Sequence, residues 1–114
     1  MDTRDKGNRC EALVAADLAS HGHRIIARNY RCRLGELDIV SVSDGVLCVT
    51  EVKSLTSKWD SSDIRYMVSP AKQVKLRKTL SHFLANNEVE GFDRIRFDVA
   101  AVTGSRIEYY HGDE

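Results

Sequence analysis

The sequence has little that would place it in a membrane or in an oxidising compartment. No hydrophobic run approaches the roughly 20 residues of a membrane-spanning helix, and residues 1–5 lack the apolar core of a signal peptide. The three cysteines, Cys10, Cys32 and Cys48, are odd in number and lack the C-x-x-C spacing of zinc or redox sites. We expect reduced thiols, no membrane segment and a cytoplasmic protein.

An excess of charge of one sign is also missing. Lys and Arg number 17, and Asp and Glu also number 17, so the formal net charge is zero. Any nucleic-acid contact would therefore have to come from a local basic patch. The four histidines show no spacing typical of metal ligands, such as H-E-x-x-H, and we assign them no chemistry.

No repeat, linker or low-complexity tract divides the chain. Its 114 residues, of which 42% are hydrophobic, are enough for one hydrophobic core. We therefore expect a single domain over residues 1–114.

The most informative stretch is residues 35–53, which predicts a β-hairpin. Two apolar, β-branched arms flank Asp44 and Gly45, a strong hairpin signal. Side chains alternate along a strand, so one face of the second arm carries Leu47, Val49, Glu51 and Lys53. Both faces of this arm are mostly apolar, which is typical of a strand in a sheet covered by helices on both sides.

Three charged residues interrupt this apolar hairpin, namely Asp38, Glu51 and Lys53. Burying a carboxylate is costly unless it is paired or bound to a cation. Asp38, Glu51 and the backbone carbonyl of Val52 would together supply oxygen ligands suited to Mg²⁺ or Mn²⁺. Lys53 would orient an attacking water or neutralise the transition state. A structural ion pair between Asp38 and Lys53 is the simpler alternative.

The remaining pattern predicts two helices and three further strands. The helices are expected over about residues 6–21 and 69–86, and the strands over 23–30, 94–102 and 106–110. Ser69 suits the N-cap of the second helix and Pro70 its first turn. Asp98 adds another strand carboxylate, which pairing with a neighbouring arginine would explain.

Glu11 lies on the apolar stripe of the first helix, in register with Val14, Ala15 and Leu18. This position directs a carboxylate toward the core. It could serve the site as a metal ligand, or it could simply offset the helix dipole near the helix start. Both interpretations stay open.

Candidate phosphate-binding residues gather at two places. Arg28, Arg31 and Arg33 belong to the densest positive segment, while Lys72 and Gln73 lie in the first turns of the second helix, where free N–H groups attract anions. Such residues can contact a phosphate backbone without reading its sequence. The alternative is that they are ordinary solvated side chains.

Several of these segments together resemble a known family. The segments are Gly7 with Glu11-Ala12, Arg28–Arg31, Gly35–Val40, Glu51–Lys53, Lys72-Gln73 and Arg96–Val99. They are similar to the YraN-like family, which is placed in the restriction-endonuclease-like PD-(D/E)xK nuclease superfamily and resembles archaeal Holliday junction resolvases in layout. The resemblance implies an α/β fold, with a three-layer α-β-α core and a mixed central sheet of about five strands flanked by helices. It also matches Glu11, Asp38, Glu51 and Lys53 to the active-site pattern of the superfamily.

The preferred hypothesis is a divalent-cation-dependent DNA endonuclease, with branched DNA as one candidate substrate. Asp38, Glu51 and Lys53 would be catalytic, and Glu11, Asp38, Glu51 and Val52 would surround the metal. The alternative is a nucleic-acid-binding or partner-binding module that kept the nuclease scaffold without turnover. Cutting two strands requires two active sites, which favours a homodimer.

Overall fold

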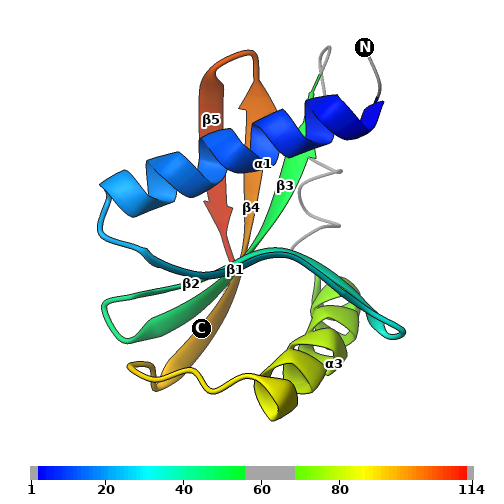
Figure 1. Ribbon diagram of the computed structural model, residues 1–114, viewed down its shortest axis with the longest axis vertical. Helices are drawn as coiled ribbons and strands as arrows, with labels where there is room; N and C mark the ends of the chain where they lie inside the picture. Colours follow the sequence, from blue (N-terminus) through cyan, green and yellow to red (C-terminus); the bar gives the residue numbers. More distant parts are fainter. Residues whose placement is uncertain (1–2, 56–68, 113–114) are drawn as a thin grey trace.

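The computed structural model describes residues 3–55 and 69–112, with side chains from residue 7 onward (Figure 1). The elements are α1 (Thr3–Ser20), β1 (Arg24–Cys32), β2 (Gly35–Ser43), β3 (Val46–Ser54), α3 (Pro70–Asn86), β4 (Arg94–Thr103) and β5 (Arg106–His111). All the expected helices and strands are present. One boundary differs in a way that matters for the site: β1 continues through Arg31 and Cys32, which the sequence placed after the strand.

The five strands form one mixed sheet in the order β1-β2-β3-β4-β5. Neighbouring strands are antiparallel except β3 and β4, which are parallel. A parallel pair needs a long crossover connection, and the chain between β3 and β4 contains α3. The helix α1 covers one face of the sheet and α3 the other. The expected α/β fold with a mixed five-strand sheet is confirmed.

Local sequence signals explain the hairpin turns and the start of α3. Asp44 and Gly45 have φ values of 51° and 77°, as the tight turn between β2 and β3 requires. Ser69 caps α3, since its side-chain oxygen accepts the N–H of Lys72 at 3.4 Å. Pro70 occupies the first turn, where its missing N–H costs nothing.

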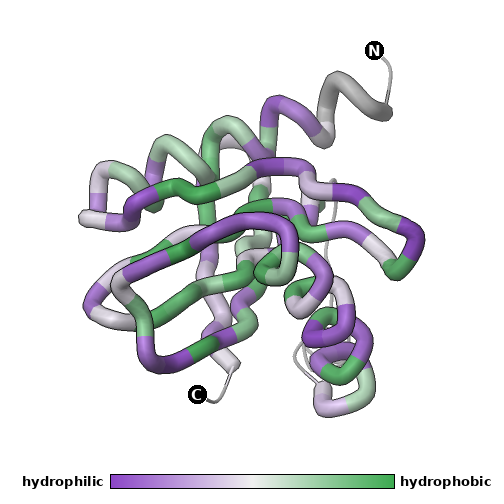
Figure 2. The backbone as a smooth tube through the Cα atoms, turned by 60° about the horizontal axis from the view of Figure 1, so that its bottom comes forward, coloured by the Kyte–Doolittle hydropathy of each residue, from purple (hydrophilic) through white to green (hydrophobic). Residues whose placement is uncertain are grey.

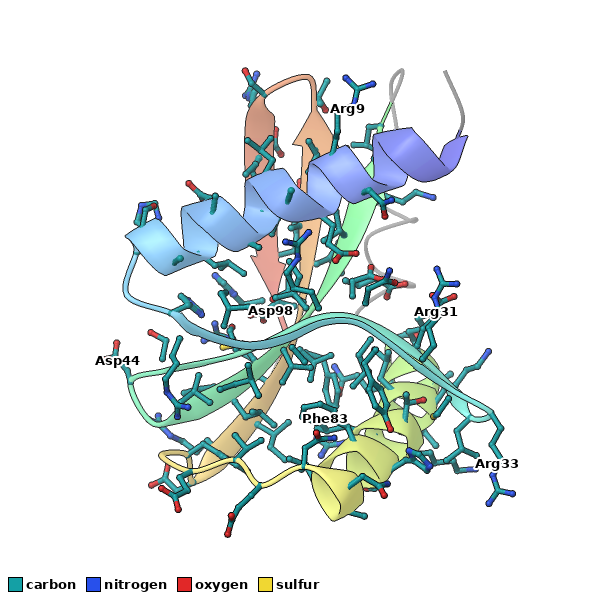
Figure 3. The ribbon with its side chains drawn as sticks, viewed as in Figure 1. Arg9, Arg31, Arg33, Asp44, Phe83 and Asp98 are labelled. Carbon is teal, nitrogen blue, oxygen red and sulfur yellow. The ribbon has the colours of Figure 1, made fainter. Side chains whose placement is uncertain are left out.

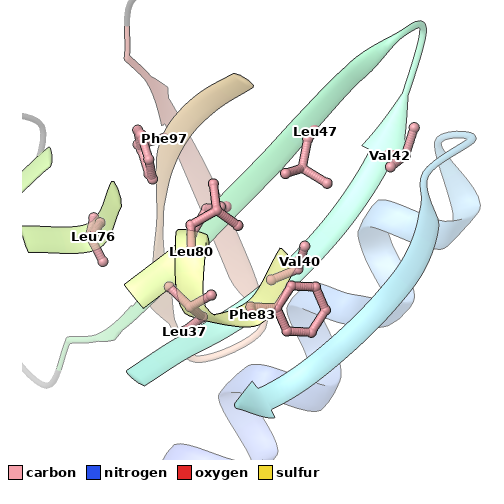
Figure 4. Packing of buried hydrophobic residues seen from close by; sticks show 9 residues of the cluster. Leu37, Val40, Val42, Leu47, Leu76, Leu80, Phe83 and Phe97 are labelled. Carbon is pink, nitrogen blue, oxygen red and sulfur yellow. The ribbon is translucent and has the colours of Figure 1, made fainter. Parts of the chain in front are cut away.

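Each face of the sheet has its own hydrophobic cluster. On the α3 side, the cluster packs α3 against β2, β3 and β4 (Figure 4), and consists of Leu37, Val40, Val42, Leu47, Val49, Leu76, Leu80, Phe83 and Phe97. On the α1 side it consists of Val14, Ala15, Leu18, Ile39, Ala100 and Val102. Hydrophilic and hydrophobic segments alternate along both helices in Figure 2, as expected for helices that bury one face.

The strand β2 changes faces at Asp38. Leu37 belongs to the cluster under α3 and Ile39 to the cluster under α1, although residues two apart in a regular strand share a face. Across from Asp38, Asn29 of β1 has a φ of 55°, which is uncommon for a residue other than glycine. Pairing of β2 with β3 ends at Ile39 and Thr50. The two strands therefore separate beside Asp38 and Glu51.

Candidate active site

A cavity of ≈ 290 Å³ lies where β2 and β3 separate, beneath α3. It is lined by Gly35, Glu36, Leu37, Asp38, Val49, Thr50, Glu51, Lys72, Lys75, Leu76 and Thr79. The two strand carboxylates that the sequence singled out, Asp38 and Glu51, thus face the same space. They could share a ligand there.

The close approach of α3 to the rim of the cavity depends on Gly35. Its φ is +150°, and a Cβ atom there would lie 2.8 Å from Oγ1 of Thr79. A larger residue would force Thr79 or the helix to shift, because contacts this short are repulsive. Gly35 therefore allows α3 to lie close to β2 at this rim.

Asp38 is fixed by a hydrogen bond that replaces the missing strand pairing. The backbone N–H of Val52 donates to its Oδ2 atom at 2.8 Å. Burial raises the pKa of Asp38 above its ordinary value of 3.8, and the Val52 hydrogen bond opposes this rise. The carboxylate is therefore held in place but only partly compensated for its desolvation.

Glu51 is also incompletely satisfied. Its Oε1 atom lies 3.4 Å from Nζ of Lys72, whereas its Oε2 atom is buried and has no hydrogen-bond partner among the residues that the structure describes. Burial raises the pKa of Glu51 above its ordinary value of 4.5, against the lowering effect of Lys72, and the charge of Asp38 raises it further. A buried oxygen without a partner is costly, and a cation would remove that cost.

These features fit a divalent cation bound by hard oxygen ligands. Mg²⁺ is commonly held by one or two carboxylates and completes its shell with water or substrate phosphates. In the described ranges, no three His, Cys, Asp or Glu side chains are grouped closely enough to hold a metal ion. Three carboxylates line the cavity: Asp38, Glu51 and the more exposed Glu36, which is paired with Arg31. The carbonyl of Val52 as a third ligand stays a prediction.

Lys53 lies at the margin of the site. It is exposed and is not among the residues that line the cavity, although its charge helps to lower the pKa of Glu51. Within the described residues it forms no ion pair with Asp38, so the structural alternative derived from the sequence does not hold. The ammonium inside the cavity belongs instead to Lys72.

Glu11 lies on α1 and does not line the cavity. Its Oε1 atom accepts a hydrogen bond from Nε of Arg28 at 3.3 Å. Burial raises its pKa, Arg28 opposes the rise, and the charge of Asp38 contributes a smaller rise. Glu11 and Asp38 therefore influence each other electrostatically. The role of Glu11 as a metal ligand stays a prediction.

The other candidate nucleic-acid-binding residues occupy different positions around the cavity. Arg31 lies near the end of β1 and Arg33 in the turn to β2 (Figure 3), and both line a second hollow that shares Gly35, Glu36 and Lys75 with the cavity. Arg31 pairs with Glu36 at 3.4 Å, and both are exposed. Gln73 is partly buried but does not line the cavity.

Sequence reasoning missed two features of the site. It predicted that Lys72 contacts nucleic acid, but not that Lys72 pairs with Glu51. It also did not recognise Thr79 as a residue that lines the cavity. Lys72, Leu76 and Thr79 follow the i, i+4, i+7 spacing of one helix face, so their shared direction was readable from the sequence. The sequence did not show which strand this helix face contacts.

Asp98 belongs to a separate cluster, as expected. Arg96 donates to both of its carboxylate oxygens, from Nε to Oδ1 at 2.9 Å and from Nη2 to Oδ2 at 3.0 Å. His111 lies 3.2 Å from the same carboxylate. The prediction that an arginine accounts for Asp98 is confirmed.

Neither of the described helices is long and apolar enough to cross a lipid bilayer. Cys10, Cys32 and Cys48 form no disulfide bond within the described part of the chain.

Comparisons with known proteins place the chain in a family. The model of the uncharacterised protein family UPF0102 matches residues 10–102. A UPF0102 protein of Moorella thermoacetica is 37% identical over 114 residues, which cover 100% of this chain and 93% of the relative. A UPF0102 protein of Sulfurihydrogenibium sp. is 34% identical over 94% of this chain and 91% of the relative. A third, of Prosthecochloris aestuarii, is 38% identical over 91% and 80%, respectively. The chain therefore belongs to the UPF0102 family, which confirms the resemblance to the YraN-like proteins.

Proposed function

We propose that this protein is a divalent-cation-dependent endonuclease that hydrolyses phosphodiester bonds in DNA, with Mg²⁺ or Mn²⁺ as the cation. One observation carries the proposal. Asp38 and Glu51 come from neighbouring strands, face one cavity and are both desolvated, and a buried oxygen of Glu51 has no partner in residues 7–55 and 69–112. A purely structural role does not explain why two carboxylates lie in one cavity, because the charge of each makes the other harder to ionise.

Different residues would have different roles in the reaction. Asp38 and Glu51 would hold the cation, which supplies positive charge to the phosphate and acidifies water when bound. Lys53, at the margin, would orient the attacking water, as its place two residues after Glu51 suggests. Arg31 and Arg33 would bind the phosphate backbone beside the cavity, without reading the base sequence.

The substrate and the assembly are part of the proposal. A single cavity cuts a single strand, so cutting both strands of a duplex or of a branched junction calls for two copies of the chain. A symmetric homodimer supplies them most simply. Branched DNA fits such an arrangement, because two opposed cavities could act on two strands at one junction.

A catalytically inactive binding module is the second candidate. The exposure of Lys53 favours it, because the lysine that would assist the chemistry is outside the cavity. Pairing of Lys72 with Glu51 also gives the carboxylate a partner without any metal. Such a module would bind DNA through the same arginines and leave it uncut.

Incubation with DNA separates the two candidates. The wild type, Glu51→Ala and the control Glu108→Ala, an exposed residue on β5, are mixed with linear, single-stranded and four-way DNA, with and without Mn²⁺. The endonuclease proposal expects cleavage by the wild type and the control only when Mn²⁺ is present, and none by Glu51→Ala. Binding without cleavage of any substrate would support the inactive module instead.

A further inference from the structure

Lys72 occupies the place in the cavity where a cation is needed. Its Nζ atom lies 3.4 Å from Oε1 of Glu51, and the side chains of Lys72 and Glu51 are only 23% and 25% exposed. The charge of Lys72 also lowers the pKa of Asp38. The ammonium is thus a counter-ion for both carboxylates in the cation-free protein.

The position of Lys72 is set by the start of α3. The Ser69 side chain accepts the Lys72 backbone N–H, which anchors the residue in the first helical turn, next to the two strands. The four single bonds of a lysine side chain allow the ammonium to move while the backbone stays in place. The Lys72 ammonium can therefore take more than one position while the backbone stays bound to Ser69.

A divalent cation and the Lys72 ammonium cannot both stay beside Glu51 at low cost. An ion bound at the unpartnered Oε2 atom of Glu51 would lie close to Nζ of Lys72, because Oε1 and Oε2 belong to one carboxylate, and like charges at short distances repel strongly inside a protein. The Lys72 side chain is partly exposed, so its ammonium can move away from Glu51 toward solvent. A phosphate bound at the cation would provide a new partner there.

We propose that Lys72 exchanges partners, from Glu51 in the cation-free protein to a phosphate oxygen of the DNA when the cation is bound. This inference rests on the proposed function and names a positioning residue for it. Without DNA, Lys72 competes with the cation. With DNA, it is released to the substrate, so that cation and DNA strengthen each other's binding.

Calorimetric titration with Mn²⁺ alone tests the competition. The proteins are the wild type, Lys72→Gln, Lys72→Arg and Lys75→Gln, the last being a control that removes the same charge from the same helix and cavity. Circular dichroism and thermal melting check that each variant is folded, and Lys72→Met serves as a second neutral variant. Loss of the competing ammonium should tighten Mn²⁺ binding by about tenfold in Lys72→Gln. The Mn²⁺ affinities of Lys72→Arg and Lys75→Gln should stay within about twofold of the wild-type affinity, since both variants keep a positive charge at position 72.

A second arm tests the transfer to phosphate. Fluorescence anisotropy measures binding of four-way DNA with and without Ca²⁺, a cation chosen to occupy oxygen ligands. Ca²⁺ should strengthen DNA binding by the wild type about tenfold more than binding by Lys72→Gln. An equal gain in both proteins would overturn the exchange of partners.

The outcomes distinguish this inference from the function on which it rests. If the wild type binds Mn²⁺ and Lys72→Gln binds it no more tightly, Lys72 is not a competitor and only the inference fails. If neither the wild type nor any Lys72 variant binds Mn²⁺, the endonuclease proposal fails together with it. Binding that is detected only in Lys72→Gln and Lys72→Met supports the inference.

Discussion

Asp38 and Glu51 are carboxylates that the fold holds at a cost to its own stability. Burial raises the pKa of each, so ionising these carboxyls costs more free energy in the folded protein than in the unfolded chain. Groups with this property are typical of functional sites, where binding of a ligand recovers the energy that folding lost. The cost should be measurable when the charge is removed.

Glu51→Gln is expected to stabilise the cation-free protein at pH 7 by about 1 kcal/mol, because it removes a desolvated charge at constant shape. The folded-state pKa of Glu51 is raised above 4.5, so its penalty is absent below pH 4.5 and complete only above the folded pKa. Urea unfolding at pH 4 and pH 7 should therefore show a gain at pH 7 only. Glu88→Gln, at an exposed position after the end of α3, serves as the control, and a loss of stability in Glu51→Gln at pH 7 would contradict the account.

His23 gives the opposite dependence on pH, on the other side of the sheet. Its Nδ1 atom lies 2.9 Å from Oγ of the fully buried Ser41. Burial lowers the pKa of His23 below 6.5, the Arg96 charge adds to this effect, and Asp98 and Asp44 oppose it. The unfolded chain therefore binds a proton first as the pH falls.

Stability should decline as the pH drops below 6.5, and His23→Gln should lose less of it than the wild type. The measurement is urea unfolding at intervals from pH 7.5 to pH 5. His21→Gln, which removes a histidine that is 71% exposed, is expected to follow the wild-type curve. Parallel curves for all three proteins would show that His23 does not contribute.

The identity of the important carboxylates could be read from the sequence, whereas the identity of the nearby ammonium could not. Asp38 and Glu51 stand out because charge is unexpected in apolar strands. Lys53 shares a strand face with Glu51 by alternation, yet it is exposed. Lys72 reaches the site across the gap between α3 and the sheet, a distance that no spacing within the sequence encodes.

Among the elements, β2 has the most consequence for the site. The hairpin of β2 and β3, the N-cap of α3 and the final strand pair follow from local signals, so the sequence predicts them. The change of face at Asp38 does not follow, because it coincides with a left-handed backbone at Asn29 in the neighbouring strand, which no local signal predicts. The pairing of β2 with β3 ends at the same place, and the cavity lies there.

Gly35→Ala should destabilise the protein by about 2–4 kcal/mol, because the new Cβ meets Thr79 and the backbone φ is unfavourable for alanine. Gly104→Ala separates these two causes. Gly104 also has a positive φ, of +63°, but nothing lies within 4 Å of the place that a Cβ atom would take, so only a backbone cost of about 1 kcal/mol is expected. Equal losses for both variants in urea unfolding would contradict a close contact with α3.

The connection of β1 and β2 should provide part of the DNA affinity. Arg33→Ser is expected to weaken binding to all DNA sequences alike and to reduce the slope of log affinity against log salt by about one. Arg106→Ser, at the far edge of the sheet and 80% exposed, is the matched control. Fluorescence anisotropy at several salt concentrations measures both, and equal slopes for the two variants would exclude the connection as a phosphate contact.

For the molecule as a whole, a zero net charge makes the placement of charge decisive. The hollow lined by Arg31 and Arg33 adjoins the acidic cavity, since both are lined by Gly35, Glu36 and Lys75. Under the proposed function, this arrangement would attract a cation and a phosphate backbone to adjoining positions, although the net charge of the protein gives no overall attraction for DNA. The fold class and the strand order of the hairpins could be predicted, but the cavity exists only in the assembled sheet.

The most direct test of the central claim is to locate a bound cation. Mn²⁺ broadens the NMR signals of nearby nuclei, so it can be added in small amounts to ¹⁵N-labelled protein while the amide signals are followed. The account predicts that the amides of Asp38, Glu51 and Val52 broaden first, and that Glu51→Gln abolishes this selectivity. Broadening centred elsewhere on the sheet, or none at a Mn²⁺ excess, would contradict the account.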